Sequence, residues 1–385
     1  MVLILKKIYI CDILIVGGKV NKTAIDLLKI INDNGYQAYL VGGYPRDLYM
    51  GRKSIDYDIC TSATPKELKN IFNDSTVHTE QYGSVTLIYQ NNRFEITTFR
   101  RDIKYLNNRK PIEIEYVDSL LEDLKRRDFT MNTMCIDQNG NLIDLMNGRG
   151  DINNKIIKTV GEADKKIYED SLRILRAIRF ATILDFDLDY DLKQAIKKHK
   201  GLLRNLSYYR KKEELDKIFS SSNCIKGINL IKELDLAQEL ELSNIEKLVP
   251  TTYLIGIWAQ LNVLDKYLFN NTEKESIIKI NEIIDKDILN DNILYNYGLY
   301  ICSIVGEIRG IDLKLINEKY NNLYIHNKTD IKIDAKEICK LLNKEPGPFL
   351  SKIFNDLEYK LVNKLIKNEK EDLTMYILKE YKNDI

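Results

Sequence analysis

Histidine and closely spaced cysteines, the common ligands of zinc and iron centres, are scarce in this 385-residue chain. It has only three histidines, which argues against a histidine-rich metal centre and against a hydrolase site built on a His–Asp pair. The six cysteines form no C-x-x-C pair and lie at positions 11, 60, 135, 224, 302 and 339. This scatter argues against structural zinc and for a reducing compartment, so we expect a cytoplasmic protein.

Long hydrophobic runs and an excess of one charge are also lacking. The apolar start, residues 1–20, is interrupted by Lys6, Lys7 and Asp12 and has no signal-peptide cleavage site, so we expect neither a membrane span nor a leader. An extra strand or a loosely packed extension is the expectation there. The formal net charge is +1, so any contact with nucleic acid must come from a local patch.

The rest of the composition is that of an ordinary globular protein, except that arginine is unevenly distributed along the chain. Hydrophobic residues make up 44% and charged residues 30% of the chain, which is long enough for two or three domains. Of fifteen arginines, only Arg309 lies beyond position 210. Arginine is favoured where phosphates or base edges are bound bidentately, although a plain difference in domain composition would give the same distribution.

The stretch from Val41 to Cys60, VGGYPRDLYMGRKSIDYDIC, begins with a turn. Residues 38–41 predict a strand, and Gly42-Gly43 allow a sharp change of direction that brings bare N–H groups close to a ligand. Pro45 suits the first position of a short helix. The pattern predicts strand, glycine turn and helix in succession.

A pair of carboxylates follows in the same stretch. Residues 55–59 alternate with period two, so Asp56 and Asp58 are expected on one face of a strand. Neighbouring carboxylates repel unless a cation lies between them, and a divalent metal with oxygen ligands, most naturally Mg²⁺, fits best. Glu95 could add a third ligand or be a half-exposed strand residue. A solvated edge strand is the alternative, but the adjacent glycine turn favours nucleotidyl transfer.

Strand and helix patterns alternate up to about residue 150. An amphipathic helix is expected from residue 22 to Gly35, and a hairpin from 85 to 99 around Asn91-Asn92. Residues 100–111 read as irregular. From Asp170 onward the pattern is helical almost to the end. The expected fold class is therefore α+β, with a small mixed head followed by a long all-α body.

Two further segments concentrate charge. Asp123 to Asn132, DLKRRDFTMN, offers Arg126 or Arg127 for a triphosphate and Asp128 or Asn132 for a ribose hydroxyl. By itself this segment could equally be a charged turn.

Glu169 to Phe180, EDSLRILRAIRF, is more specific. Arg173, Arg176 and Arg179 fall along one drifting face of a helix, with leucine and isoleucine on the other. Asp170 precedes Arg173 by three residues, so their side chains can meet. A solvated arginine face is the alternative, but three arginines in a segment of a lysine-rich chain argue against it.

In order and spacing, these three segments resemble the motifs of the bacterial-type tRNA nucleotidyltransferases, the CCA-adding enzymes, which share them with bacterial poly(A) polymerases. The resemblance is dense from about Lys22 to Phe219. It implies a polymerase-β-like head followed by a helical neck, body and tail. Three departures are Tyr44-Pro45 in the glycine motif, Thr133 after Asn132, and Tyr209 before Arg210.

The resemblance also implies roles for individual residues. Asp56 and Asp58 would be the catalytic pair that binds Mg²⁺. Asp170 and Arg173 would read the nucleotide base. The remaining residues implied to bind the nucleotide are Gly43, Arg46, Arg127, Arg176 and Arg179.

The implied activity is template-independent addition of CCA to the 3′ end of tRNA from CTP and ATP. The implied organisation is an extension (1–21), a nucleotidyltransferase head (22–150), a neck that recognises the base (151–220), and a body and tail that bind tRNA (221–385). Poly(A) addition, CC-only or A-only addition, and a catalytically silent RNA-binding relative remain alternatives. Neither a membrane nor a protein partner is indicated.

Overall fold

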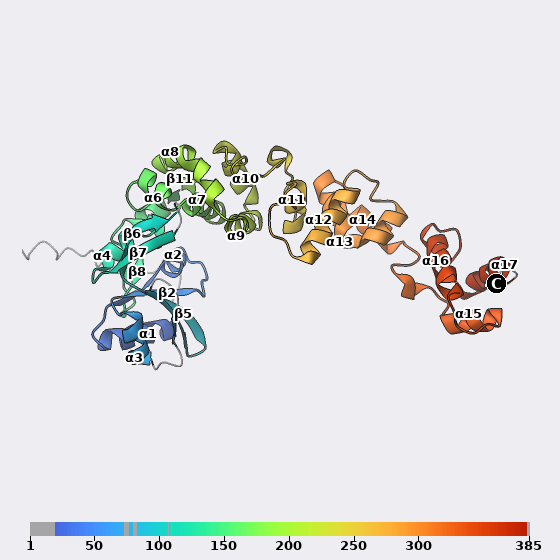
Figure 1. The fold of residues 1–385 in the computed structure, drawn as a ribbon, viewed down its shortest axis with the longest axis horizontal. Coiled ribbons are helices and arrows are strands. Elements are labelled where there is room, and N and C mark those ends of the chain that lie inside the picture. Colours follow the sequence, from blue (N-terminus) through green and yellow to red (C-terminus); the bar gives the residue numbers. More distant parts are fainter. Residues whose placement is uncertain (1–19, 73–76, 80–82, 107, 109, 383–385) are drawn as a thin grey trace, which may run out of the picture. The chain divides into compact units, whose positions relative to one another are not determined.

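The structure, a computed structural model, describes residues 20–72, 77–79, 83–106, 108 and 110–382, so nearly all of the expected N-terminal extension lies outside the described residues. The chain forms two compact units, one that reaches Glu241 and one that begins at Leu242 (Figure 1). Within the described ranges, no helix is both long enough and apolar enough to span a bilayer.

A seven-stranded mixed sheet forms the first part of the first unit. Its order is β3-β4-β5-β2-β1-β8-β9; β2 and β5 run parallel, and the other neighbours run antiparallel. The strands are β1 (Ala38–Val41), β2 (Tyr57–Thr61), β3 (Val77–Thr79), β4 (Ser84–Tyr89), β5 (Asn92–Thr98), β8 (Cys135–Ile136) and β9 (Leu142–Ile143). β2 is therefore an interior strand, with β1 on one side and β5 on the other.

Short helices accompany the sheet, and the first confirms its prediction. Asn21 caps α1 by accepting a hydrogen bond from the N–H of Ala24 at 3.2 Å, and Leu27, Leu28 and Ile31 bury its apolar face. These side chains join a core with strand residues such as Phe94. The helices are α1 (Lys22–Asp33), α2 (Gly43–Tyr49), α3 (Pro65–Phe72), α4 (Leu120–Lys125), the 3₁₀ turn η3 (Thr130–Asn132) and α5 (Gly148–Asn153).

Two expectations for this region are corrected. The alternation expected from Ile55 does not hold at its first residue, because β2 starts at Tyr57 and Ile55 is 82% exposed. Residues 100–111, expected to be irregular, belong largely to a hairpin of β6 (Arg100–Leu106) and β7 (Lys110–Tyr116). The hairpin from 85 to 99 is confirmed, with Gln90 and Asn91 at its turn in the left-handed region.

The β6–β7 hairpin makes a contact with a segment that is distant in sequence. Asn108, between β6 and β7, accepts a hydrogen bond from the N–H of Ser171 at 2.9 Å and donates one to the carbonyl of Tyr168 at 2.7 Å. Because these partners lie about 60 residues away, no local pattern could indicate them. The hairpin therefore reaches the segment that contains Asp170.

Helices make up most of the rest of the first unit. α7 is buried almost all round and packs against α6, α9 and α10 (Figure 1). The elements are β10 (Ile156–Ile157), α6 (Ala163–Glu169), α7 (Leu172–Leu184), β11 (Asp187–Leu188), α8 (Tyr190–His199), η4 (Lys200–Asn205), α9 (Tyr208–Phe219) and α10 (Cys224–Glu233). The arginine face of α7 is thus not the solvated face of the alternative interpretation.

The second unit is helical throughout the residues described, as expected. α13 is interrupted at Gly298, which has φ 74° and ψ 167°. Before this break Tyr295 donates to Glu358 of α16 at 2.7 Å, whereas after it Gly306 packs on Ile316 of α14. The elements are η5 (Ile245–Lys247), α11 (Leu254–Gln260), α12 (Asn271–Ile283), α13 (Asp291–Arg309), α14 (Leu313–Asn321), η6 (Lys328–Asp330), α15 (Ala335–Leu342), α16 (Phe349–Val362) and α17 (Lys370–Tyr381).

Candidate active site

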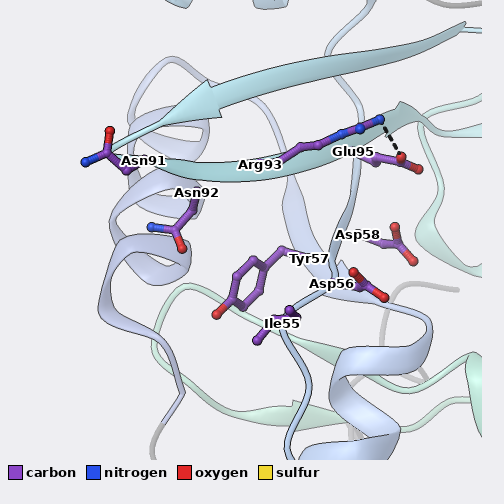
Figure 2. Close-up of a pocket in the computed structure, with 8 residues that line it drawn as sticks. All are labelled: Ile55, Asp56, Tyr57, Asp58, Asn91, Asn92, Arg93 and Glu95. Carbon is purple, nitrogen blue, oxygen red and sulfur yellow. Dashed lines mark hydrogen bonds and ion pairs between the residues drawn. The ribbon is translucent and has the colours of Figure 1, made fainter. Parts of the chain in front are cut away.

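The expected carboxylate pair lies at the start of β2. Asp58 is on the strand, Asp56 is two residues earlier, and Glu95 is the partner of Asp58 in the parallel register of β2 and β5. All three line one cleft of about 720 Å³, and Figure 2 shows their side chains along the same wall. The remaining lining residues are Ile55, Tyr57, Asn91, Asn92 and Arg93.

The electrostatics of the pair fit a cation. Burial raises the pKa of Asp58, Glu95 and Asp56 raise it further, and the charge of Arg127 opposes the rise. A half-buried carboxylate with like-charged neighbours is stabilised by a divalent ion that prefers oxygen ligands. Within the described ranges no three His, Cys, Asp or Glu side chains are grouped closely enough to hold a metal, and Glu95 pairs with Arg93 at 3.2 Å. Asp56 and Asp58 are therefore the candidate metal ligands, and a third ligand at Glu95 stays a prediction.

The glycine turn is fitted closely against this pair. Gly42 has φ 83°, and a Cβ there would lie 3.0 Å from Oδ2 of Asp58. A side chain at this position would therefore be strained and would also displace the carboxylate. Gly43 begins α2, and a Cβ on it would lie 3.6 Å from Nη2 of Arg46. The two glycines of the turn therefore lie close to Asp58 on one side and to Arg46 on the other.

Arg46 is held in a fixed position. Its Nη1 donates to Oδ1 of Asn132 at 2.7 Å, and its Nη2 donates to Oδ1 of Asp47 at 2.9 Å. The residue is 8% exposed. Asn132 accepts this bond from Arg46 and donates to Asp128 at 3.3 Å, and its expected contact with a ribose hydroxyl stays a prediction.

A second cleft, of about 320 Å³, collects most of the arginines expected at the nucleotide site. Arg127, Asp170, Arg173 and Arg176 all line it. The other lining residues are Arg100, Asp102, Tyr105, Arg126, Asp128 and Leu172. Of the residues expected to bind the nucleotide, Gly43, Arg46 and Arg179 do not line either of these two clefts in the described part of the chain.

Asp123 organises one wall of the second cleft. Its side chain is fully buried, accepts from Arg126 at 2.8 Å and from Arg127 at 3.2 Å, and accepts from the N–H of Arg100 at 3.3 Å. Burial alone would raise the pKa of Asp123, but Arg127 and Arg126 hold it below its ordinary value. Sequence reasoning gave this residue no role, although its spacing of three and four residues from two arginines was a usable signal.

Arg173 is anchored more firmly than its spacing from Asp170 suggested. Nη1 donates to the carbonyl of Lys166 at 2.7 Å and to Glu169 at 3.1 Å, and Nη2 donates to the carbonyl of Arg126 at 3.2 Å. Guanidinium has five N–H groups, so these three bonds leave two for other acceptors. Oδ1 of Asp170 accepts from the N–H of Leu172 at 3.0 Å at the start of α7.

The other two arginines of α7 are paired with carboxylates of other elements. Arg176 pairs with Asp128 at 2.6 Å, and Arg179 pairs with Glu214 of α9 at 3.0 Å. Burial alone would raise the pKa of Asp128, but Arg176 holds it well below its ordinary value. Asp128 is therefore the ion-pair partner of Arg176. No pattern in the local sequence indicated that Glu214 would pair with Arg179. Arg210, beside the unusual Tyr209, pairs with Glu213 at 2.8 Å.

Three family models match successive parts of the chain. They describe the poly A polymerase head domain (residues 38–158), the RNA and SrmB-binding site of polymerase A (185–245) and tRNA nucleotidyltransferase domain 2 (242–377). A solved structure of the Bacillus stearothermophilus CCA-adding enzyme in complex with CTP is 28% identical, with a TM-score of 0.73, over 93% of this chain and 96% of that one.

Curated relatives match over nearly the whole chain. A CCA-adding enzyme of Streptococcus agalactiae serotype V is 31% identical over 399 residues, which covers 94% of this chain and 97% of the relative. A CCA-adding enzyme of Staphylococcus epidermidis is also 31% identical, over 91% of this chain and 96% of its own. Identity at this level along almost the full length of both chains shows that the protein belongs to the CCA-adding enzyme family of tRNA nucleotidyltransferases.

Proposed function

We propose that this chain adds C, C and A to the 3′ end of tRNA, with CTP and ATP as substrates. The observation that carries the proposal is the carboxylate cleft beside an arginine-lined cleft in one compact unit, in a chain of this family. In the reaction the 3′-hydroxyl oxygen of the RNA bonds to the α-phosphorus of the triphosphate. The bond between that phosphorus and the bridging oxygen breaks, and pyrophosphate leaves.

Asp56 and Asp58 are proposed to hold Mg²⁺, because their hard oxygen atoms and the raised pKa of Asp58 suit a divalent ion. When bound, such ions activate the attacking hydroxyl and stabilise the leaving oxygen. The protein's own residues position the substrates. Gly42 has no side chain, so the backbone can lie close to Asp58. Arg46, next to the glycine turn, is held by Asn132, and Arg127, in the second cleft, is held by Asp123.

Base selection is proposed to depend on Asp170 and Arg173. Cytosine and adenine both present an exocyclic amino donor beside a ring-nitrogen acceptor, whereas guanine and uracil present a carbonyl in place of that amino group. A carboxylate accepts and a guanidinium donates, so one pair can serve both accepted bases. The anchoring of Arg173 by Glu169 and two carbonyls supports this role, because it fixes the direction of its two remaining N–H groups.

The division into an extension (1–21), head (22–150), neck (151–220) and tRNA-binding body and tail (221–385) stays a prediction. Support for RNA binding beyond residue 241 comes from exposed tyrosines interspersed with lysines, for example Tyr324, Tyr359 and Lys332. Exposed aromatic rings and flexible cations suit a large polyanion.

The decisive experiment uses tRNA that lacks its last three nucleotides. With Mg²⁺ and both triphosphates, gel analysis is expected to show three added residues, whereas CTP alone should give two. Continued addition of A would favour a poly(A) polymerase, and arrest after two residues with both triphosphates would favour CC-only addition. No extension under any condition would favour a silent RNA-binding relative and contradict the proposal.

A further inference from the structure

One aromatic ring, that of Phe180, is surrounded by three guanidinium groups. The Cζ atoms of Arg179, Arg46 and Arg176 lie 4.4 Å, 5.2 Å and 5.5 Å from its centroid. All three distances are within the roughly 6 Å over which a cation is attracted to the face of a ring. The family resemblance implies a nucleotide-binding role for all three arginines, and Arg176 also lines the arginine-rich cleft.

The ring lies where two parts of the first unit meet. Arg46 comes from α2, directly after the glycine turn of the sheet, whereas Arg176 and Arg179 come from successive turns of α7. Phe180 is 8% exposed, and its ring packs edge-on against the ring of Phe129. The two ring centroids are 5.8 Å apart, and the interplanar angle is 83°. Phe129 is fully buried, so the ring of Phe180 has a rigid support.

Charge repulsion within the group is compensated one arginine at a time. Arg46 pairs with Asp47 at 2.9 Å, Arg176 with Asp128 at 2.6 Å, and Arg179 with Glu214 at 3.0 Å. The three carboxylates lie in different places: Asp47 follows Arg46 in α2, Asp128 lies between α4 and η3, and Glu214 is in α9. The ring of Phe180 is the contact that the three have in common.

The pKa of Arg179 shows that the arginines interact with one another. Burial lowers it, Glu214 opposes the change, and the charges of Arg176 and Arg46 lower it further. The three carboxylates reduce this repulsion, but each of them holds only one arginine, whereas the ring of Phe180 contacts all three. A neutral ring with a negative face supplies attraction without neutralising the charge available to a phosphate.

We propose that Phe180 is a positioning residue: its ring is a shared platform that holds Arg46, Arg176 and Arg179 in one arrangement toward the nucleotide. This inference rests on the proposed function, because it concerns the arginines of that site. It adds a residue that makes no proposed contact with substrate and acts only through the three guanidinium groups. It also explains how α2 and α7, which are more than a hundred residues apart, are kept in register at the site.

Stepwise fluorination of Phe180 tests the platform, because each fluorine weakens the negative face of the ring while its shape changes little. Mono-, di- and trifluorinated phenylalanine would be placed at position 180 of the full chain, and kcat and KM for CTP measured on truncated tRNA. One cation–π contact changes an equilibrium constant by roughly two- to five-fold. KM is therefore expected to rise in steps to about 10-fold, with kcat changed less than about 3-fold. The preference for CTP over UTP should not change, since base selection is proposed to depend on Asp170 and Arg173 and not on the three arginines over the ring.

Phe99 provides a matched control. It is fully buried in the same unit and stacks on Tyr39 at 6.4 Å. The same fluorinated series at Phe99 should leave KM unchanged. A flat KM across the Phe180 series, or an equal rise in the Phe99 series, would show that Phe180 is a packing residue and overturn the platform. If the wild-type protein extended no truncated tRNA, the proposed function would fail first and the platform with it.

Discussion

The two units of this protein carry positive charge in different forms. Fourteen of the fifteen arginines lie in the first unit, and several pair with buried carboxylates such as Asp123, Asp128 and Glu214. The second unit has one arginine, and its lysines pair at the surface; in the Lys332–Glu369 pair both side chains are more than half exposed. Several cations of the first unit are thus held by buried carboxylates, whereas the Lys332–Glu369 pair of the second unit is exposed to solvent.

The physical consequence differs between the units. A buried, multiply bonded guanidinium loses little freedom when it binds a small anion, and it cannot relax easily toward a wrong ligand. An exposed lysine is screened by salt, contributes little to stability, and can follow the backbone of a long polyanion. This difference agrees with the proposed function, in which the first unit binds the nucleotide and the second unit contacts the tRNA.

The largest effect is expected at the carboxylate pair of the first unit. Asp56→Ala or Asp58→Ala should lower the rate of Mg²⁺-dependent addition by at least about 10³-fold, because several kcal/mol of transition-state stabilisation is lost with the metal. Asp58→Ala should not reduce the stability of the metal-free protein. The raised folded-state pKa of Asp58 means that its charge costs stability as the pH rises through that value. Single-turnover extension and urea unfolding measure both effects, and near-normal turnover would exclude this metal site.

A second prediction tests whether fixed charges confer selectivity. Asp170→Ala should reduce the preference for C over U by at least about 100-fold, since a buried hydrogen-bonding site can reject the wrong group by roughly 10⁴–10⁵-fold. The assay is single-nucleotide extension of a truncated tRNA with each triphosphate in turn. A variant that is slower but retains its full preference would mean that Asp170 is structural and only caps the start of α7.

Removal of the Arg176–Asp128 ion pair should destabilise the fold, and the loss of stability should depend on pH. Arg176→Gln is expected to lower the free energy of unfolding at neutral pH by about 2 kcal/mol, less than for a fully buried pair because a third of the Arg176 side chain is exposed. The depressed pKa of Asp128 means that the pair stabilises the fold above the unfolded pKa of about 4 and is lost as the pH falls through the folded value. The difference between variant and wild type should therefore shrink below pH 4. A difference independent of pH would show that packing, not charge, is responsible.

Alanine substitutions at Gly42 and Gly298, which have similar φ, distinguish the effect of backbone strain from an effect on the carboxylate site. Gly42→Ala and Gly298→Ala should each cost about 1–3 kcal/mol of stability, because φ is 83° and 74°. Only Gly42→Ala brings a Cβ within 3.0 Å of Asp58, whereas a Cβ at Gly298 meets open space. Turnover measured well below the melting temperature should therefore fall sharply for the first variant and little for the second. Equal losses of turnover would contradict the separation of roles.

The smallest effect is expected at the surface of the second unit. Lys332→Gln should change the free energy of unfolding by less than about 0.5 kcal/mol, because its pair with Glu369 is exposed. If this lysine contacts a phosphate, the slope of tRNA affinity against salt concentration should fall by about 1. Binding measured at several salt concentrations checks this, and an unchanged slope would place the RNA surface elsewhere.

Sequence alone determined what depends on short-range patterns. Period-two alternation located Asp58 with Tyr57 and Ile59 buried on either side of it, and the Gly42-Gly43 turn and Asn21-capped helix follow from local backbone preferences. The charged segments around Arg127 and Arg173 were identified by spacing, and the structure brings both to one cleft. Local propensity could do this because each of these features is complete within about twelve residues.

The tertiary structure decided which charges meet. Arg176 finds Asp128 across 48 residues, Arg179 finds Glu214 across 35, and Arg46 finds Asn132 across 86. It also paired residues expected to be irregular in the β6–β7 hairpin, joined Asn108 of that hairpin to Ser171, and placed Phe180 among three arginines. Such contacts form only when separate elements pack, because the desolvation of a buried charge must be offset by a partner that the local sequence does not contain.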